Sequence, residues 1–501
     1  MVANTTVPAG VTLREDTLAF LNNDKQLLIN GEWVAPAEGG SMPTLNPANG
    51  ETLLNFAIGT QADVDKAVDV ARRALHGAWG QMTGDDRGRI LWKIGELIEA
   101  NIDMLAELET LDSGKPLESS KGEISNAAAQ FRYFAGWASK IEGSTIPVSN
   151  PDELVYTIRE PMGVVGIITP WNFPLLMVSW KLPAALATGN TVILKPAEQT
   201  PLTALALGNL ALEAGLPPGV FNIITGPGDP TGNAITHHMG IDKVAFTGST
   251  GVGRKIMAAA ANSNLKRVSL ELGGKSPHVI FADADLEQAV GDAQWGVFYN
   301  TGQECTSGTR LFVQRPAYDE IVERFKALTG EMTVGNGLTN PDLGPMISER
   351  QLNTVMGYIK AGVDEGAEVI TGAERIGGDL ANGYFLQPTV FAHQNDSLTI
   401  VREEIFGPVQ TITAFDDWDD LIPRVNNTVY GLAAGIWTSN LKTAHRFAAA
   451  TQAGTIWING YAKFDPAAPF GGMKQSGFGR EMGKDVLELY TQTKTVWVGL
   501  R

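Results

Sequence analysis

The sequence predicts an α/β protein in which two domains and an extended arm are interleaved along one chain. Its 501 residues exceed what one ordinary hydrophobic core accommodates. Short apolar segments alternate with helical segments between residues 163 and 272, which is typical of a parallel sheet covered on both faces, and a second α/β pattern runs from 276 to about 470. No tandem repeat or low-complexity linker separates the two stretches.

The individual elements follow from periodicity and turn residues. Residues 1–25 predict a polar arm, and residues 26–34 predict a hairpin that turns at Asn30-Gly31. Residues 62–140 are predicted to be helical because apolar positions recur three and four apart. The remaining predictions are extended segments at 145–148 and 154–158, sheet strands at 164–169, 191–195, 221–225, 244–247 and 268–272, helices near 181–188, 202–214, 231–238 and 251–261, and a last strand at 491–498. A parallel sheet of this kind binds nucleotides at the carboxyl ends of its strands.

Composition excludes several classes of function. A 44% hydrophobic content indicates a globular chain, and a net charge of −17 argues against nucleic-acid or anionic-membrane partners. The first residues show no basic stretch followed by an apolar one, and no apolar run reaches about 18 residues, so we expect a cytoplasmic protein. With one cysteine, no internal disulfide is possible.

That cysteine, Cys305, is the first candidate for chemistry. A lone cysteine is most often a small buried hydrophobe. Here Gly302 allows a close backbone approach, and Gln303, Glu304 and Thr306 are polar, which is an unusual setting for a core side chain. A thiolate is a strong nucleophile and suits attack on a carbonyl carbon.

Glu271 is the second candidate. It lies in the alternating segment 268–272, on the face opposite the leucines, and Gly273-Gly274 follow it directly. The simpler interpretation is a solvated strand carboxylate. The two glycines indicate tight packing near the end of the strand, where α/β active sites lie, and a carboxylate in a partly dry cleft can act as a general base.

Two loops are further candidates. Asn172, in the proline-bounded segment 170–174, follows a predicted strand and offers an amide that could donate to an oxyanion, although a loop-capping role is more common. Residues 246–253 lead from a strand into a helix through glycines and could hold a phosphate, but their spacing is a weak dinucleotide motif. The segment 226–232 could be only a proline-rich turn, and the adjacent His237 and His238 would point to different helix faces, so no metal site is expected.

Together these segments resemble the aldehyde dehydrogenase superfamily over nearly the whole chain, from about residue 28 to residue 498. The segments that carry the resemblance are PWNFP (170–174), TVILKPAEQTP (191–201), FTGST (246–250), LELGGK (270–275), GQEC (302–305), EEIFGPV (403–409) and PFGGMKQSGFGRE (469–481). Their number and order make the match far more specific than any single motif.

The resemblance implies a catalytic role for four residues. Cys305 would be the nucleophile, forming a thiohemiacetal and then a thioester, and Glu271 would activate the water that hydrolyses the thioester. Asn172 would hold the oxyanion together with the Cys305 backbone N–H, and Lys181 would lie near the base. Members that transfer the acyl group to coenzyme A lack the carboxylate, so Glu271 favours release of a free acid.

The resemblance also implies the cofactor site. Lys195 and Glu198 would bind the adenosine ribose, and Glu198 would repel a 2′-phosphate, which favours NAD over NADP. Ser249 would contact the pyrophosphate, and Glu404 and Phe406 would hold the nicotinamide ribose and ring. The other implied cofactor contacts are Thr169, Trp171, Gly228, Phe246, Gly248, Thr250, Gly253 and Leu272.

The implied substrate tunnel is lined by Phe173, Leu176, Met177, Trp180, Glu304, Thr306, Phe464 and Phe470. This lining suits a medium-sized apolar or aromatic aldehyde, although the same aromatics could be ordinary core. Glu304 and Asp465 leave an ω-amino or trimethylammonio aldehyde as the alternative, because aromatic walls also bind cations. A non-catalytic structural protein would be expected to have lost a catalytic residue, and an esterase would need no NAD.

The resemblance finally implies domain boundaries and an assembly. A Rossmann-like NAD-binding domain would comprise residues 1–139 and 161–271, and the catalytic domain residues 272–470. Residues 140–160 would form an oligomerisation arm with the C-terminal strand in 471–501. An extended arm leaves an unpaired strand edge, so we expect a homodimer or homotetramer.

Overall fold

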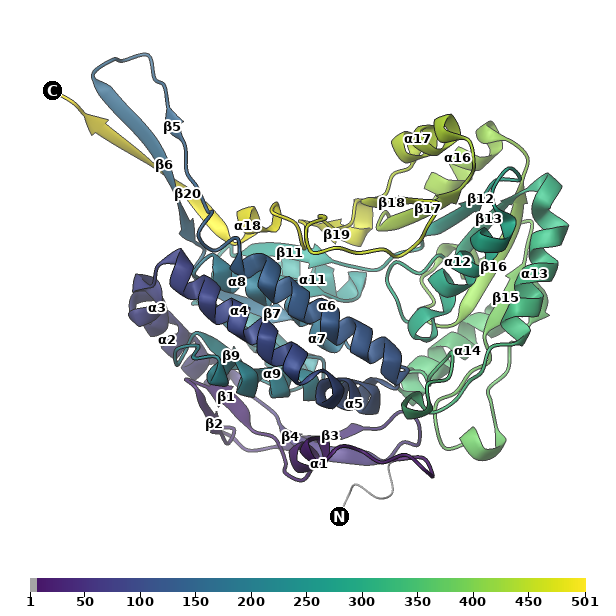
Figure 1. The fold of residues 1–501 in the computed structure, drawn as a ribbon, viewed down its shortest axis with the longest axis horizontal. Helices are drawn as coiled ribbons and strands as arrows, with labels where there is room; N and C mark the ends of the chain where they lie inside the picture. The colour runs from purple at the N-terminus through teal and green to yellow at the C-terminus, as the bar shows by residue number, and fades with distance from the viewer. Residues whose placement is uncertain (1–6) are drawn as a thin grey trace.

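The computed structural model describes residues 7–501 and shows two α/β lobes with an arm that projects from the first (Figure 1). The first lobe contains an eight-stranded sheet whose five central strands, β9-β8-β7-β10-β11, are parallel. In sheet order the strands are β19 (Gly477–Phe478), β11 (Arg267–Glu271), β10 (Lys243–Thr247), β7 (Val164–Ile168), β8 (Thr191–Lys195), β9 (Phe221–Ile223), β1 (Leu27–Ile29) and β2 (Glu32–Val34). The five predicted strands and the hairpin are thereby confirmed.

Helices pack around this sheet, and α4 and α6 lie along each other across one side of the lobe (Figure 1). Several begin at the polar residues that favour a helix start: Thr83 caps α4, and Ser249 caps α11. The helices of this lobe are α1 (Glu15–Leu21), α2 (Gln61–His76), α3 (Ala78–Gln81), α4 (Gly84–Ala100), α5 (Ile102–Ser113), α6 (Leu117–Ala135), α7 (Pro174–Ser179), α8 (Leu182–Ala187), α9 (Leu202–Glu213), α10 (Asn233–His237), α11 (Thr250–Ala261) and α18 (Val486–Leu489).

The predicted polar arm at 1–25 is wrong where the structure describes it. Residues 15–21 form α1 instead, because Leu21 and Thr17 are buried and the Thr17 hydroxyl donates to Glu107 Oε2 at 2.5 Å. Residues 1–6 lie outside the described part. The sequence analysis also missed the hairpin of β3 (Ser41–Leu45) and β4 (Thr52–Ala57).

The second lobe is built on a seven-stranded sheet that is parallel except at its β14 edge. In sheet order its strands are β14 (Glu368–Thr371), β15 (Thr389–Ala392), β16 (Val409–Phe415), β13 (Arg310–Gln314), β12 (Pro277–Ile280), β17 (Ala433–Trp437) and β18 (Thr455–Ile458). Its α-helices are α12 (Leu286–Phe298), α13 (Tyr318–Gly330), α14 (Glu349–Asp364), α15 (Thr399–Arg402), α16 (Trp418–Asn426) and α17 (Leu441–Ala450). The second predicted α/β pattern is confirmed.

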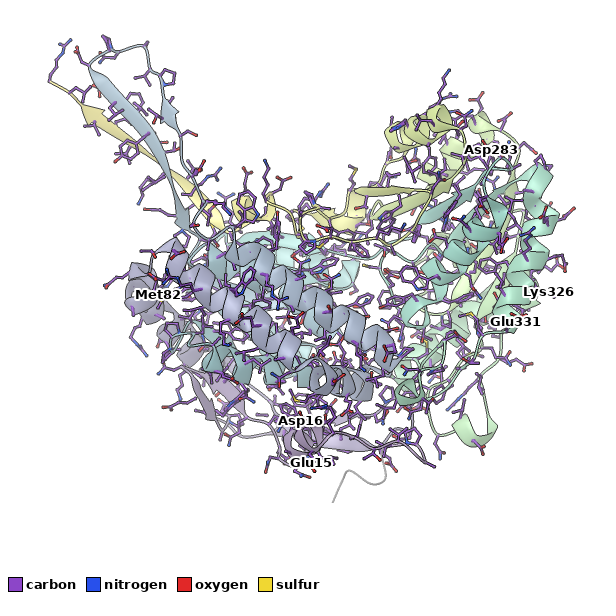
Figure 2. All side chains as sticks on the ribbon, in the orientation of Figure 1. Glu15, Asp16, Met82, Asp283, Lys326 and Glu331 are labelled. Carbon is purple, nitrogen blue, oxygen red and sulfur yellow. The ribbon has the colours of Figure 1, made fainter. Side chains whose placement is uncertain are left out.

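The arm is a separate three-stranded antiparallel sheet of β5 (Thr145–Ile146), β6 (Glu153–Pro161) and β20 (Thr491–Gly499). Figure 2 shows that the arm extends away from the rest of the chain and carries side chains on both of its sides. Trp497 is 61% exposed, and Leu154 and Ile158 are exposed too. The domain boundaries remain a prediction. Strand β19 lies in the segment 471–501, which was assigned to the arm, but it pairs with β11 of the first sheet.

Across residues 7–501, no helix is both long and apolar enough to cross a membrane.

Candidate active site

The first sheet reverses its strand order between β7 and β10, and this reversal fixes the position of the site. From β7 the chain moves to β8 and β9 on one side and to β10 and β11 on the other. Loops that leave adjacent parallel strands at such a point diverge and open a crevice at the carboxyl ends. Thr169 follows β7, Gly248 follows β10, and Glu271 is the last residue of β11.

A cavity of about 300 Å³ opens at this edge of the sheet, and both Cys305 and Glu271 line it. All eight residues predicted for the substrate tunnel lie on its wall: Phe173, Leu176, Met177, Trp180, Glu304, Thr306, Phe464 and Phe470. Seven further wall residues were not predicted from the sequence: Gly122, Glu123, Asn126, Thr247, Trp295, Tyr299 and Ala462. Nothing in the local sequence of α6 distinguishes Glu123 from the solvated glutamates that helices commonly carry.

The Cys305 thiol is partly exposed to the cavity. Its loop packs tightly on the chain after β11: a Cβ atom added to Gly274 would lie 2.2 Å from the Cys305 carbonyl oxygen. Burial raises the pKa of the thiol well above its ordinary value, and the nearby carboxyls of Glu304, Glu404 and Glu271 raise it further. The resting side chain is therefore a neutral thiol that must lose a proton before it can attack.

Glu271 projects from the end of β11 into the cavity and is only 5% exposed. Burial, then the Glu481 carboxyl, raises its pKa well above the usual range, whereas Lys181 lowers it. Within residues 7–501 its Oε2 atom has no hydrogen-bond partner. A carboxyl with a raised pKa is a stronger base than an exposed one, and the unpaired oxygen is the one left to accept a proton.

Lys181 links that base to a second buried carboxyl. Its Nζ donates to Thr247 Oγ1 at 2.7 Å and lies 3.3 Å from Glu481 Oε1. The family resemblance places Lys181 near the base. It does not single out Glu481, although this residue ends the segment 469–481. Its burial becomes visible only when β19 is folded against β11.

Asn172 lies in the loop after β7 and joins this loop to the nucleophile loop. Its side-chain Nδ2 donates to the Gln303 carbonyl at 2.8 Å, which leaves its second N–H for another acceptor. Its backbone carbonyl accepts from Asn300 Nδ2 at 2.8 Å and from Lys115 Nζ at 2.9 Å. The oxyanion role of Asn172 remains a prediction, and these contacts hold the residue beside Cys305.

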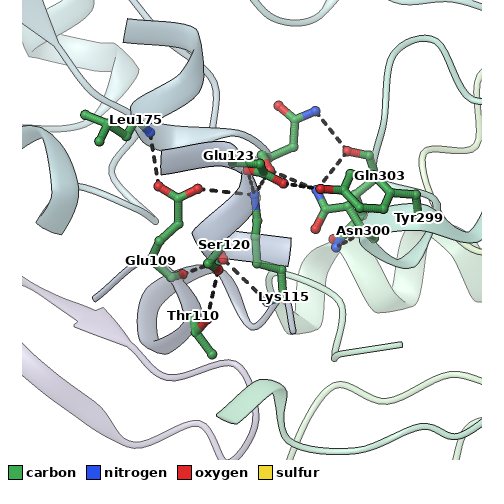
Figure 3. A network of polar contacts seen from close by, with 11 residues as sticks. Glu109, Thr110, Lys115, Ser120, Glu123, Leu175, Tyr299, Asn300 and Gln303 are labelled. Carbon is green, nitrogen blue, oxygen red and sulfur yellow. Dashed lines mark hydrogen bonds and ion pairs between the residues drawn. The ribbon is translucent and has the colours of Figure 1, made fainter. Parts of the chain in front are cut away.

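Lys115 is the centre of a buried polar network (Figure 3). Its Nζ forms ion pairs with Glu109 Oε1, at 3.4 Å, and with Glu123 Oε2. Tyr299 OH donates to the other oxygen of Glu123 at 2.8 Å, and Leu175 N donates to Glu109 Oε2 at 3.2 Å. Burial raises the pKa of Glu123 to about 8. The network ties α5 and α6 to the catalytic loops.

The residues expected to bind the adenosine end of a dinucleotide lie beside β8 and α11. Lys195 is almost fully buried, and its Nζ lies 3.6 Å from Glu198 Oε2. Ser249 caps α11 by accepting from Val252 N at 3.4 Å. Thr169, Phe246 and Gly248 flank this helix start at the ends of β7 and β10, Thr250 begins the helix, and Gly228 lies in the turn at 228–232.

The residues expected at the nicotinamide end surround the Gly273-Gly274 turn. Glu404 Oε1 accepts from Gly274 N at 2.9 Å, and a Cβ on Gly273 would lie 2.1 Å from Glu404 Oε2. Phe406 and Trp171 meet edge to face at 5.2 Å. Leu272 packs on Gly253, where a Cβ would lie 2.7 Å from its Cδ2. In residues 7–501 no three His, Cys, Asp or Glu side chains are grouped so that they could hold a metal ion.

Comparison with known proteins agrees with this geometry. The aldehyde dehydrogenase family model matches residues 33–496. An aldehyde dehydrogenase of Aspergillus niger is 50% identical over 471 residues, which is 94% of each chain. The NAD⁺ complex of an aldehyde dehydrogenase from Bacillus cereus is 47% identical, with a TM-score of 0.96 over 98% of this chain and 100% of that one. A betaine aldehyde dehydrogenase from Staphylococcus aureus in complex with NAD⁺ is 38% identical, with a TM-score of 0.95 over 97% of both chains.

The family match covers almost all of both lobes, and the candidate nucleophile and base lie on one cavity, so the chain belongs to the aldehyde dehydrogenase family.

Proposed function

We propose that this protein oxidises an aldehyde to the carboxylic acid with NAD, through a thioester on Cys305 that water hydrolyses with the help of Glu271. One observation carries the proposal: the only thiol of the chain and a buried carboxyl with a raised pKa line the same cavity. The apolar side chains that line this cavity, against which Cys305 packs, can hold the body of an aldehyde.

The chain's own groups account for the covalent steps. The Cys305 thiol first gives up its proton to water. Its thiolate then adds to the aldehyde carbon, and the amide of Asn172 and the Cys305 backbone N–H stabilise the oxyanion. An interaction of this kind contributes about 3–4 kcal/mol to barrier lowering. Bound NAD supplies the hydride acceptor for the oxidation. Glu271 then takes a proton from water, the water oxygen attacks the thioester carbon, and the acid leaves as the thiol is restored.

The residues of the cofactor region fit NAD chemically. The start of α11, a helix of 12 residues, has backbone N–H groups that could hold a pyrophosphate. Lys195 and Glu198 together offer a donor and an acceptor to ribose hydroxyls. A carboxylate there repels a 2′-phosphate, which supports NAD over NADP. The kcat/KM ratio for the two cofactors measures this preference directly.

The substrate we favour is a medium-sized apolar or aromatic aldehyde. The cavity wall carries Phe173, Trp180, Phe464 and Phe470. The alternative, an ω-amino or trimethylammonio aldehyde, has the betaine aldehyde dehydrogenase relative and the Glu304 carboxyl in its favour. Asp465 adds little to it, because its side chain is exposed and accepts from Ala467 N at 2.8 Å.

Two variants test the mechanism. Glu271→Gln keeps the shape of the base but cannot deprotonate water, so we expect one burst of NADH at 340 nm followed by a stall. Cys305→Ala should abolish both the burst and the steady rate. A steady rate in Glu271→Gln equal to that of the wild type would show that another group activates the water. Turnover of an ester without NAD would separate esterase activity from oxidation.

We also propose that the protein is a cytoplasmic homodimer or homotetramer that assembles through the arm. The two outer strands of the arm, β5 and β20, each leave one edge unpaired within residues 7–501, and Leu154 and Ile158 on β6 and Trp497 on β20 expose apolar surface. Trp497→Asp should lower the mass measured by light scattering toward that of the 53.5 kDa chain. An unchanged mass would place the interface elsewhere.

A further inference from the structure

Asn300 holds the proposed oxyanion donor from outside the cavity. It lies in the short helical turn Tyr299–Gly302, between α12 and Cys305, and is only 4% exposed. Its Nδ2 donates to the backbone carbonyl of Asn172 at 2.8 Å (Figure 3). This contact spans 128 residues of sequence, so it is more than a local turn contact: it joins the loop after β7 to the nucleophile loop.

The backbone around Asn300 has an uncommon conformation. The φ angles of Asn300, Thr301 and Gly302 are +49°, +57° and +67°. Asparagine and glycine tolerate this left-handed region, but a β-branched threonine is strongly disfavoured there. The surrounding chain fixes the segment: Thr301 Oγ1 donates to the Gly344 carbonyl at 3.1 Å, and a Cβ on Gly302 would lie 2.2 Å from the Gly407 carbonyl oxygen. Backbone strain that is held in this way occurs most often at functional sites.

The backbone and the side chain of Asn300 have different partners. Its backbone carbonyl accepts from Gln303 N at 3.1 Å and from Gln303 Nε2 at 3.2 Å, and these contacts shape the loop that carries Cys305. Its side-chain amide donates to Asn172 and makes only a long second contact, of 3.4 Å, with the Gln303 carbonyl. The Asn172 amide donates to that same carbonyl at 2.8 Å. The Asn300 side chain therefore holds Asn172 against a loop that the Asn300 backbone shapes.

We infer that Asn300 is a positioning residue that sets the orientation of the Asn172 amide relative to Cys305. This inference rests on the proposed function, in which that amide stabilises the oxyanion. A donor lowers the barrier only when it is aimed at the position of the oxyanion, and a small displacement reduces the rate. Lys115 Nζ also donates to the Asn172 carbonyl, at 2.9 Å, so loss of the Asn300 amide should loosen Asn172 without releasing it.

Asn300→Gly tests the inference, because glycine adopts the left-handed backbone and keeps the carbonyl contacts while the amide is lost. The measurement is the rate of NADH formation in the first turnover, by stopped flow, with saturating NAD and phenylacetaldehyde or hexanal. Asn172→Ala should lower this rate about 100- to 1,000-fold, and Asn300→Gly about tenfold. The control is Asn340→Gly, which also removes an amide from a left-handed position, where it accepts from Glu118 N at 2.9 Å. It should keep the wild-type rate.

The double variant Asn172→Ala/Asn300→Gly separates positioning from a purely structural role. Asn300 bonds the backbone oxygen of residue 172, which Asn172→Ala retains, so a loss of loop stability is the same in both backgrounds. If Asn300 acts through the Asn172 amide, adding Asn300→Gly to Asn172→Ala should change the rate less than about twofold. An equal loss in both backgrounds overturns the inference, and so does a wild-type rate in Asn300→Gly alone.

Alkylation of Cys305 by iodoacetamide, followed by mass spectrometry, is a readout that needs no aldehyde oxidation. Alkyl transfer forms no oxyanion, so Asn300→Gly should react within about twofold of the wild type at the same pH. A larger change would show that the variant disturbs the thiol itself and would overturn the inference. If Asn300→Gly does not fold, Asn300→Asp, which keeps the side-chain size without the amide donor, replaces it in the double-variant comparison.

The single variants distinguish failure of this inference from failure of the proposed function. A wild-type first-turnover rate in Asn172→Ala would refute the oxyanion role of Asn172, and the inference with it. A large loss in Asn172→Ala together with an additive effect of Asn300→Gly would refute the inference alone.

Discussion

Replacing Lys115 with methionine should destabilise the protein by about 3 kcal/mol or more. The Lys115 side chain is fully buried and forms ion pairs with Glu109 and Glu123. Burial raises the pKa of Glu123 to about 8 even with Lys115 beside it, so this carboxyl is mostly uncharged near neutrality and stays so when the lysine is removed. One buried charge, on Glu109, is then left without its counter-ion, which costs about 3–5 kcal/mol.

The lower end of that range is expected because other contacts survive. Glu109 still accepts from Leu175 N at 3.2 Å, and the Asn172 carbonyl still accepts from Asn300 Nδ2. Equilibrium unfolding in urea, followed by tryptophan fluorescence at one protein concentration, measures the loss as a shift of the midpoint at constant slope.

Lys121 in α6 is the matched control. It also pairs with two carboxylates, Asp103 at 3.2 Å and Glu118 at 3.4 Å, but its side chain is 34% exposed. Ion pairs this exposed contribute under about 1 kcal/mol, so Lys121→Met should change little. Equal midpoints for the two variants would refute the reasoning. It would mean that the buried network contributes no more than a surface pair.

Three further predictions concern the reaction centre. Glu304→Gln removes a carboxyl that raises the pKa of Cys305. The alkylation rate of the thiol should therefore reach half of its maximum at a lower pH than in the wild type. An unchanged pH profile would show that the Glu304 carboxyl does not raise the pKa of the thiol. Lys181→Met removes a positive charge that lowers the pKa of Glu271. The acid limb of the steady-state rate profile should therefore move to higher pH. A shift to lower pH would contradict the effect assigned to Lys181. Gly274→Ala places a methyl 2.2 Å from the Cys305 carbonyl oxygen and should reduce kcat by about tenfold or more. Gly291→Ala in α12, where an added methyl would meet open space, should not.

The sequence predicted the first sheet well because a strand buried on both faces is a short apolar run, and such runs at 164–169, 191–195 and 244–247 are visible without coordinates. It missed α1 and the β3–β4 hairpin. Those segments are mixed in polarity, and their burial depends on partners distant in sequence, such as Glu107 for Thr17.

The candidate nucleophile and base could be predicted because each lies in a distinctive local segment. Lys115, Glu123 and Glu481 could not. Glu123 reaches the cavity only because α6 packs beside the loop of Asn172, and the contact between Glu123 and Tyr299 spans 176 residues of sequence. Short-range patterns contain no information about which of many glutamates such a contact selects.

The three glutamates on the cavity wall differ only in their partners, and the partners decide what each can do. Glu123 is paired with Lys115 and Tyr299, so its charge is balanced from behind the wall. Glu271 has a free oxygen and lies near Lys181, which suits proton transfer. Glu304 has a free oxygen and no cation among its hydrogen-bond partners, and burial raises its pKa to about 7. A count of carboxyls would suggest a cationic substrate, but only Glu304 is left to attract one, and it is uncharged over much of the acidic range. The charge balance of the wall therefore supports the proposed neutral aldehyde over a cationic one.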